Sequence, residues 1–322
     1  MYSSGKNLKD EGSRSQVVIA GAISGMTARF FIAPLDVIKI RLQLQTTPIN
    51  SSLSRRSPFF SPLDTGALST LRKILKYEGI TALWKGNIPA GLMYISYSAI
   101  QFTTYRSTSL ALQNFLGEHY FSTAAESFIA GACAGATATT ATYPLDLLRT
   151  RLAAQGTEKI YFSLAHSVKK IYKSEGPNGF FRGIGAGVGQ IVPHMGIFFS
   201  VYETIRLPLG TLRLPFSTGD ALAGVLASII AKTCVFPFDL IRKRLQVQGP
   251  TRSKYFYKDI PNYQGIFQTF QKILMSEGPR GLYRGLTMSL FKSAPTGAII
   301  IFTYEKALHM LMKFDKIYQE LK

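Results

Sequence analysis

The sequence contains three copies of one unit, and this repetition limits the possible folds more than any other feature. Each copy carries a proline, an acid two residues later, and bases five and seven residues later. These motifs begin at Pro34, Pro144 and Pro237. Further along each copy, Glu-Gly is followed by an aromatic residue, a base and a glycine. Because both motifs recur in the same order, the chain consists of three tandem repeats of about 100 residues.

Each repeat predicts two long helices, joined by a loop that contains a short amphipathic helix. Small residues four apart precede each proline and allow close helix approach in lipid. The long helices are expected at 16–45, 87–115, 122–155, 184–209, 218–248 and 286–312, each longer than the ~20 residues that cross a bilayer. The sequence thus predicts an all-α membrane protein with six tilted transmembrane helices in three pseudo-threefold repeats. The repeats are expected at 16–117, 118–212 and 213–314, between an N-terminal tail, 1–15, and a C-terminal tail, 315–322.

Composition agrees with a membrane protein and indicates an anionic partner. Hydrophobic residues make up 46% of the chain and charged residues 17%, below the ~25% of an ordinary soluble protein. The 37 basic residues exceed the 18 acidic ones, for a net charge of +19. Such an excess suits nucleic acid, an anionic membrane surface or a phosphorylated small molecule. Because the bases recur at matching places within apolar segments, they favour the lining of a pore or cavity over a nucleic-acid surface.

The sequence lacks the features of several other protein classes. Cys133 and Cys234 have no metal-ligand spacing, so we expect neither a metal site nor a disulfide framework. The glycine-rich stretch 183–189 departs from the dinucleotide-binding spacing, and no other catalytic motif occurs, so no enzyme is expected. The segment 1–15 has no apolar core and carries acidic residues, which predicts a chain without a signal peptide or cleaved presequence.

The two repeated motifs resemble those of the mitochondrial carrier family over residues 16–312. This resemblance implies a bundle in the inner mitochondrial membrane, with both termini on the outer side and a substrate cavity that opens alternately to either side. The stretches 33–45, 84–89, 100–106 and 235–252 further resemble fungal members that carry thiamine pyrophosphate. We therefore expect a monomer without cofactors that imports thiamine pyrophosphate into the matrix by exchange. Another phosphorylated cargo, such as a nucleotide or coenzyme A, and a non-transporting interaction protein of the same fold remain alternatives.

The acid and the first base of each proline motif are three residues apart and share one helix face, so three such helices can close a ring of ion pairs. The resemblance makes this ring a matrix gate. The expected pairs are Lys39 with Asp146, Arg149 with Asp239, and Arg242 with Asp36. Gln43 and Gln246 stand where the family places glutamines that brace these pairs, whereas Ala153 has no amide for the third brace.

An outer gate and lipid sites are also implied by the resemblance. Of the outer motifs only Tyr202, Glu203 and Arg206 fit the full pattern of aromatic, acid and base, while Glu305 and Arg106 belong to incomplete copies. We therefore expect a weak outer gate. Cardiolipin is expected where a base and a glycine precede a helix, because a helix amino terminus attracts anions. These positions are Lys85, Gly86, Arg182, Gly183, Arg284 and Gly285.

Candidate substrate residues lie on the helix stripe above the gate. Arg29, Thr139 and Lys232 stand seven residues before the gate aspartates. Family contact positions on the even-numbered helices give Met93, Gln190 and Lys292. Arg29, Lys232 and Lys292 could neutralise a diphosphate. Tyr97 and His194 are candidates to stack on, or hydrogen-bond with, an organic ring.

Overall fold

The computed structural model describes residues 13–46, 66–116, 123–211, 218–257 and 260–320. The predicted repeat boundaries at 117/118 and 212/213 and most of the N-terminal tail lie outside these residues. The chain forms two compact units. One comprises 1–36 with 287–322, and the other comprises 37–286.

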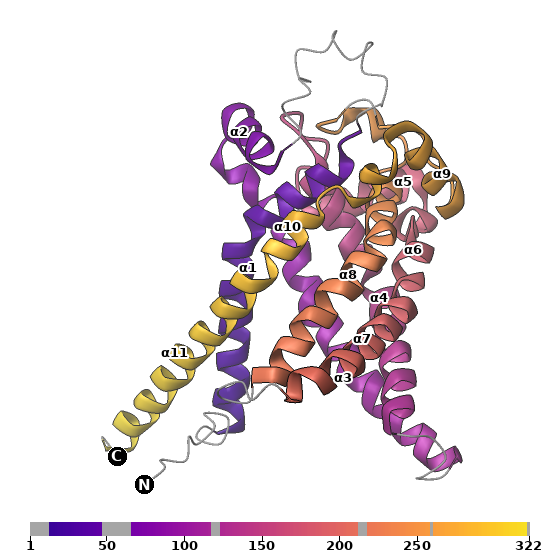
Figure 1. Ribbon diagram of the computed structural model, residues 1–322. Coiled ribbons are helices and arrows are strands. Elements are labelled where there is room, and N and C mark those ends of the chain that lie inside the picture. The colour runs from indigo at the N-terminus through magenta and orange to yellow at the C-terminus, as the bar shows by residue number, and fades with distance from the viewer. Residues whose placement is uncertain (1–12, 47–65, 117–122, 212–217, 258–259, 321–322) are drawn as a thin grey trace. The chain divides into compact units, whose positions relative to one another are not determined.

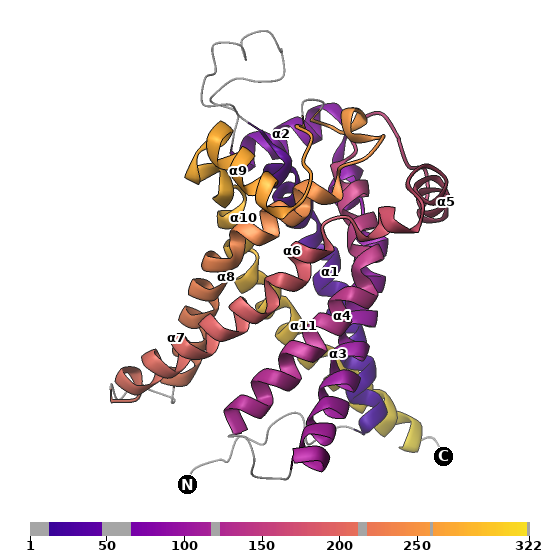
Figure 2. The ribbon, with the colours of Figure 1, turned by 90° about the vertical axis from the view of Figure 1, so that its right-hand side faces the viewer.

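The larger unit holds long helices that run in pairs. Helix α3 (Asn87–Leu116) packs along α4 (Thr123–Ala154), and α7 (Ile191–Thr211) packs along α8 (Thr218–Gln246), as Figures 1 and 2 show. The carboxyl end of α1 (Arg14–Leu44) belongs to the same unit from residue 37 onward. Pro144 and Pro237 lie inside α4 and α8, as predicted.

Each repeat also contains a short helix, as its sequence predicts. These are α2 (Ala67–Tyr77), α5 (Leu164–Glu175) and α9 (Ile266–Glu277). A 3-10 turn follows each of them: η4 (Ile80–Trp84), η5 (Pro177–Phe181) and η8 (Pro279–Tyr283). A further 3-10 turn, η7 (Arg252–Lys254), lies after α8. Apart from one isolated β-bridge between Gln155 and Tyr255, all regular structure in the described residues is helical.

The smaller unit contains α1 up to Asp36 and α11 (Ser293–Glu320), together with α10 (Leu286–Phe291) from residue 287. Ala20, Ala307 and Leu308 form its buried apolar core. Near the helix ends, the Gln16 side-chain amide donates to Asp315 at 2.6 Å. These contacts hold α1 and α11 together.

The helices predicted at 184–209 and 286–312 are present, and each contains a short break. The first consists of α6 (Ile184–Gly189) and α7, with the break at Gln190, and the second consists of α10 and α11, with the break at Lys292. Proline lies three residues after each break, at Pro193 and Pro295. Proline has no N–H to donate to the carbonyl four residues earlier, so one helical hydrogen bond is missing beside each break. Both breaks fall on residues predicted to contact substrate.

Among the residues that the structure describes, four helical stretches are long and apolar enough to cross a membrane: 16–44, 177–209, 219–246 and 279–315. Helices α3 and α4 have 30 and 32 residues. They are therefore long enough to span, although they do not meet the same standard of apolar composition. Where they pack along each other, Ser109 and Gln113 of α3 donate hydrogen bonds to Glu126 of α4.

Three completely buried arginines hold the repeats of the larger unit together. Each is the second base of a proline motif and pairs with the glutamate of the Glu-Gly motif in its own repeat. The pairs are Arg41 with Glu78, Arg151 with Glu175 and Arg244 with Glu277. A buried arginine requires such a partner, because an unpaired buried charge is strongly destabilising.

The same arginines also donate to main-chain oxygens of the next repeat. Arg41 donates to Ala153 and Gln155, Arg151 to Gln246 and Gln248, and Arg244 to Gln43 and Gln45, at 2.9–3.2 Å. The contacts therefore run from the first repeat to the second, from the second to the third, and from the third back to the first. We call these three residues the arginine belt.

Candidate functional site

The acid of the third proline motif, Asp239, joins α8 to α1. Lys39 Nζ lies 2.7 Å from Asp239 Oδ2, and the Gln43 amide donates to the same oxygen at 3.0 Å. Both charged side chains are largely buried, with 13% and 22% of their surface exposed. The glutamine therefore braces the ion pair, as the sequence predicts for Gln43.

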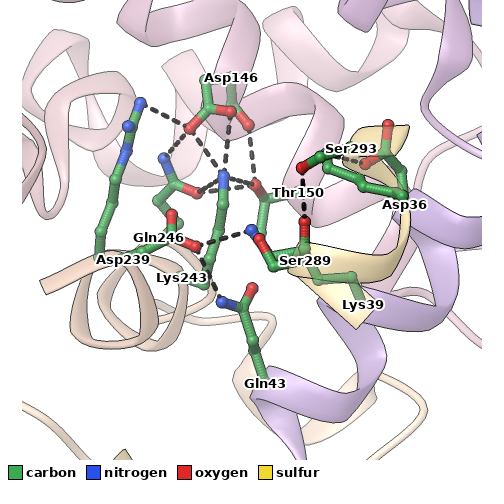
Figure 3. A network of polar contacts seen from close by, with 12 residues as sticks. Asp36, Lys39, Gln43, Asp146, Thr150, Asp239, Lys243, Gln246, Ser289 and Ser293 are labelled. Atoms are coloured by element: carbon green, nitrogen blue, oxygen red, sulfur yellow. Dashed lines mark hydrogen bonds and ion pairs between the residues drawn. The ribbon is translucent and has the colours of Figure 1, made fainter. Parts of the chain in front are cut away.

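The acid of the second motif, Asp146, joins α4 to α8. An Arg242 Nη lies 2.8 Å from Asp146 Oδ2, and the Gln246 amide donates to this oxygen at 2.6 Å. The guanidinium of Arg242 also stacks over the Tyr143 ring, 4.9 Å from its centroid. Gln246 is thus the second brace, and Figure 3 shows it beside Asp146.

The direction of pairing around the ring is opposite to the prediction. Lys39 binds Asp239 rather than Asp146, and Arg242 binds Asp146 rather than Asp36. Arg149, expected on Asp239, has its guanidinium over the Tyr94 ring, 5.8 Å from the centroid. A three-residue spacing places acid and base on one helix face, but that face has a neighbour on either side. The spacing alone does not decide which neighbour each base meets.

In the smaller unit, Asp36 binds two bases that were predicted to contact substrate. An Arg29 Nη lies 2.7 Å from one carboxylate oxygen, and Lys292 Nζ lies 2.6 Å from the other. The sequence predicts all three residues as functional but does not predict that they meet. The arrangement thus brings two cations to one carboxylate.

The other candidate substrate residues lie in the larger unit. Thr139 is buried, whereas Met93, Tyr97, Gln190, His194 and Lys232 are partly exposed. The His194 backbone N–H donates to the Gln190 carbonyl at 3.0 Å, across the break between α6 and α7. Lys232 is close enough to act electrostatically on His194. Lys232 lies on α8 and His194 on α7, two helices that pack along each other.

The predicted outer-gate residues make few contacts. Arg206 pairs with Asp220 on α8 at 2.9 Å and packs over the Tyr202 ring, 5.9 Å from its centroid. Asp220 is not among the predicted outer-gate residues because it lies outside the motif of aromatic residue, acid and base. Glu203 and Arg106 make no ion pair with the described residues of their own unit. Glu305 of the smaller unit is exposed.

The bases of the predicted lipid sites turn towards protein acids. Lys85, Arg182 and Arg284 each pair with the glutamate of their own Glu-Gly motif. Lys85 also donates to the carbonyl of Gly156 at 2.7 Å. The glycines that follow, Gly86, Gly183 and Gly285, have φ of 81°, 82° and 85°, in the left-handed region that favours glycine.

Glu78 shows the electrostatic effect of this arrangement. Burial acts to raise the pKa of the Glu78 carboxyl, but the hydrogen bonds and charges of Arg41 and Lys85 outweigh it. The net pKa lies below its ordinary value of 4.5, so Glu78 is ionised at neutral pH.

Sequence reasoning did not single out Lys243 or assign partners to the arginine belt. Lys243 follows Arg242 directly, and the corresponding positions in the other repeats hold Ile40 and Thr150. A residue type that occurs in only one repeat does not form part of a repeated motif. The arginines do recur, but their glutamate partners lie 24 to 37 residues away along the chain.

Comparison with known proteins agrees with this architecture. The sequence model of the mitochondrial carrier protein family matches residues 11–116, 121–211 and 215–315. The chain is 64% identical over 316 residues to "Mitochondrial thiamine pyrophosphate carrier 1" of Sclerotinia sclerotiorum, covering 98% of both chains. Proteins of the same name from Botryotinia fuckeliana and Aspergillus terreus are 64% and 57% identical, also over 98% of both chains. The chain with these three repeats belongs to the mitochondrial carrier protein family.

Proposed function

We propose that this carrier transports thiamine pyrophosphate into the mitochondrial matrix, across the inner membrane, by alternating access and exchange. The observation that supports this substrate most directly is 64% identity, over 98% of both chains, to a protein named for thiamine pyrophosphate transport. The family and these relatives are transporters, so the chain is a transporter and not an enzyme.

The charge of the candidate substrate residues supports an anionic cargo. Arg29 and Lys292 share the single carboxylate of Asp36, so a diphosphate can draw one or both of them away. Arginine suits two-pronged binding of phosphate oxygens, while lysine acts as a point charge. Lys232 adds a third cation on α8.

The remaining candidates suit the organic part of the cargo. Tyr97 and His194 offer rings for stacking on an aminopyrimidine or a thiazolium. Gln190 offers an amide for hydrogen bonding, Met93 an adaptable apolar contact, and Thr139 a hydroxyl. Gln190 and Lys292 stand at the helix breaks.

In this proposal the aspartates and bases of the proline motifs form the matrix gate. The observed pairs of Lys39 with Asp239 and of Arg242 with Asp146 tie neighbouring odd-numbered helices together. Such pairs contribute little when water reaches them, and can therefore break and re-form in each cycle. The outer gate, with Tyr202, Glu203, Arg206, Glu305 and Arg106, is weaker, so the matrix gate sets the resting state.

Cardiolipin binding completes the proposal. The left-handed glycines Gly86, Gly183 and Gly285 stand before the even-numbered helices, whose first N–H groups lack helical partners. Lys85, Arg182 and Arg284 add positive charge nearby, although each also binds a glutamate. The carrier acts as a monomer in this proposal, and thiamine pyrophosphate is its cargo rather than a cofactor.

A nucleotide or coenzyme A is the second candidate cargo, because the two cations at Asp36 suit any phosphorylated anion. The test is thermal unfolding of the purified protein with thiamine pyrophosphate, thiamine monophosphate, thiamine, ADP or coenzyme A. A ligand that binds only the folded state raises the apparent Tm. We expect thiamine pyrophosphate to give the largest rise and to be taken up by liposomes that contain the carrier. A larger rise in Tm with ADP or coenzyme A, together with uptake of that compound, would show that this compound is the cargo instead of thiamine pyrophosphate.

A further inference from the structure

Lys243 is a charged residue of the gate region that belongs to none of the repeated motifs. We propose that Lys243 is a second gate cation, which ties α8 to α4 independently of Arg242 and makes this junction the stronger of the two gate junctions in the larger unit. The inference rests on the gate in the proposed function. It concerns opening of the gate and does not depend on which anion is carried.

The contacts of Lys243 are those of a cross-link between two helices. Its Nζ lies 2.8 and 3.0 Å from the two oxygens of Asp146 and 3.0 Å from Thr150 Oγ1, all on α4. It also lies 3.1 Å from the Gln246 side-chain oxygen on α8. An ammonium has three N–H donors, so four acceptors satisfy it fully. Figure 3 shows Lys243 reaching in among these groups.

The two gate junctions of the larger unit differ because of this lysine. Asp239 receives one cation, Lys39, and one amide, Gln43. Asp146 receives two cations, Arg242 and Lys243, and one amide, Gln246. The corresponding position in the first repeat is Ile40, which has no charge to offer.

The second cation is not needed to neutralise Asp146. Without Lys243, Asp146 keeps Arg242 at 2.8 Å and Gln246 at 2.6 Å, so no buried carboxylate is left unpaired. Removing Lys243 also removes a surplus buried charge, since Asp146 and Asp239 face Lys39 as well as the two bases of α8. We therefore expect its loss to change the balance between gate states rather than to prevent folding.

The experiment measures the separation of the repeats by double electron–electron resonance in liposomes without substrate. Nitroxide labels at Lys169→Cys on α5 and Gln271→Cys on α9 report on α4 and α8, against which these helices pack. Both label sites are exposed. The exposed native thiols, Cys133 and Cys234, are changed to serine.

We expect Lys243→Met to raise the population of longer distances on the order of tenfold, which corresponds to 1.4 kcal/mol. Lys243→Arg keeps the charge and should stay near the wild type. Lys254→Met is the matched control, because Lys254 is an exposed lysine of the same unit. Equal distance distributions for Lys243→Met and Lys254→Met would overturn the proposal.

Loss of a cooperative melting transition in both Lys243→Met and Lys243→Gln would also overturn it, because the lysine would then be required for folding. The outcome is separate from that of the cargo test. If thiamine pyrophosphate fails to stabilise the wild type, the proposed cargo is wrong, whereas the distance measurement still decides the role of Lys243.

Discussion

The ion pair of Lys39 with Asp239 allows the direction of pairing around the proposed gate to be tested by charge exchange. Lys39→Asp places two carboxylates opposite each other where the structure has an ion pair at 2.7 Å. The double change Lys39→Asp with Asp239→Lys restores opposite charges across the same junction. We therefore expect the single change to lower the stability and the uptake activity of the carrier. The double change should restore most of both.

The free-energy cost of breaking this ion pair follows from its burial. Fully exposed pairs contribute about 0–1 kcal/mol, whereas breaking a buried pair costs about 3–5 kcal/mol. The two side chains are 13% and 22% exposed, and Gln43 continues to donate to Asp239. We expect Lys39→Asp to cost about 3 kcal/mol, near the lower end of the buried range. For a chain of 322 residues this lowers the apparent Tm by roughly 4 °C.

The assay combines thermal unfolding in detergent with substrate uptake by liposomes. Lys39→Asp with Asp146→Lys is the control exchange, because it would restore a pair only if the ring ran in the opposite direction. The double change at Asp239 should bring the free energy of unfolding to within about 1 kcal/mol of the wild type, and the change at Asp146 should not. Recovery by the Asp146 exchange alone would refute the pairing and its energetic account.

Four further changes test separate parts of the structure. Lys292→Ala should nearly abolish uptake with little change in Tm, and normal uptake would remove Lys292 from the substrate site. Gly86→Ala should destabilise by more than about 2 kcal/mol, because its φ is 81° and a new Cβ would lie 2.6 Å from a backbone oxygen. Gly79→Ala, at the same φ with no neighbour within 4 Å, should cost only about 1 kcal/mol in thermal unfolding. Arg244→Lys should cost about 3 kcal/mol, because lysine cannot keep the two-pronged bond to Glu277 together with the main-chain contacts. A Tm equal to the wild type would show that these bonds add nothing to stability.

Much of the fold could be predicted because the repeats supply the same signal three times. The proline motifs, the short amphipathic helices and the glutamine braces at Gln43 and Gln246 are local patterns of spacing and residue type. The breaks at Gln190 and Lys292 had a signal too, since a proline follows each by three residues. Pro144 and Pro237 lie inside the continuous helices α4 and α8, however, so a proline alone does not predict a break.

The partners around the ring could not be predicted in the same way. The choice of Asp239 over Asp146 for Lys39 depends on how three helices are arranged in space, and no pattern within one helix contains that information. The meeting of Arg29 and Lys292 at Asp36 depends likewise on contact between segments about 256 residues apart in the chain. Contacts of this kind require the tertiary structure.

The arginine belt has a consequence for how the chain is made. Arg151 in the second repeat needs the carbonyls of Gln246 and Gln248 in the third, and Arg244 of the third repeat returns to the first. A ribosome delivers the repeats in order, so no arginine of the belt has all its acceptors until a later or an earlier repeat has come into place. A product that stops after the second repeat leaves Arg151 without those carbonyls, and a buried arginine in that state is unstable. The contacts of the arginine belt are therefore complete only after all three repeats have been translated. A truncated chain lacks part of these contacts and differs from a finished chain in this respect.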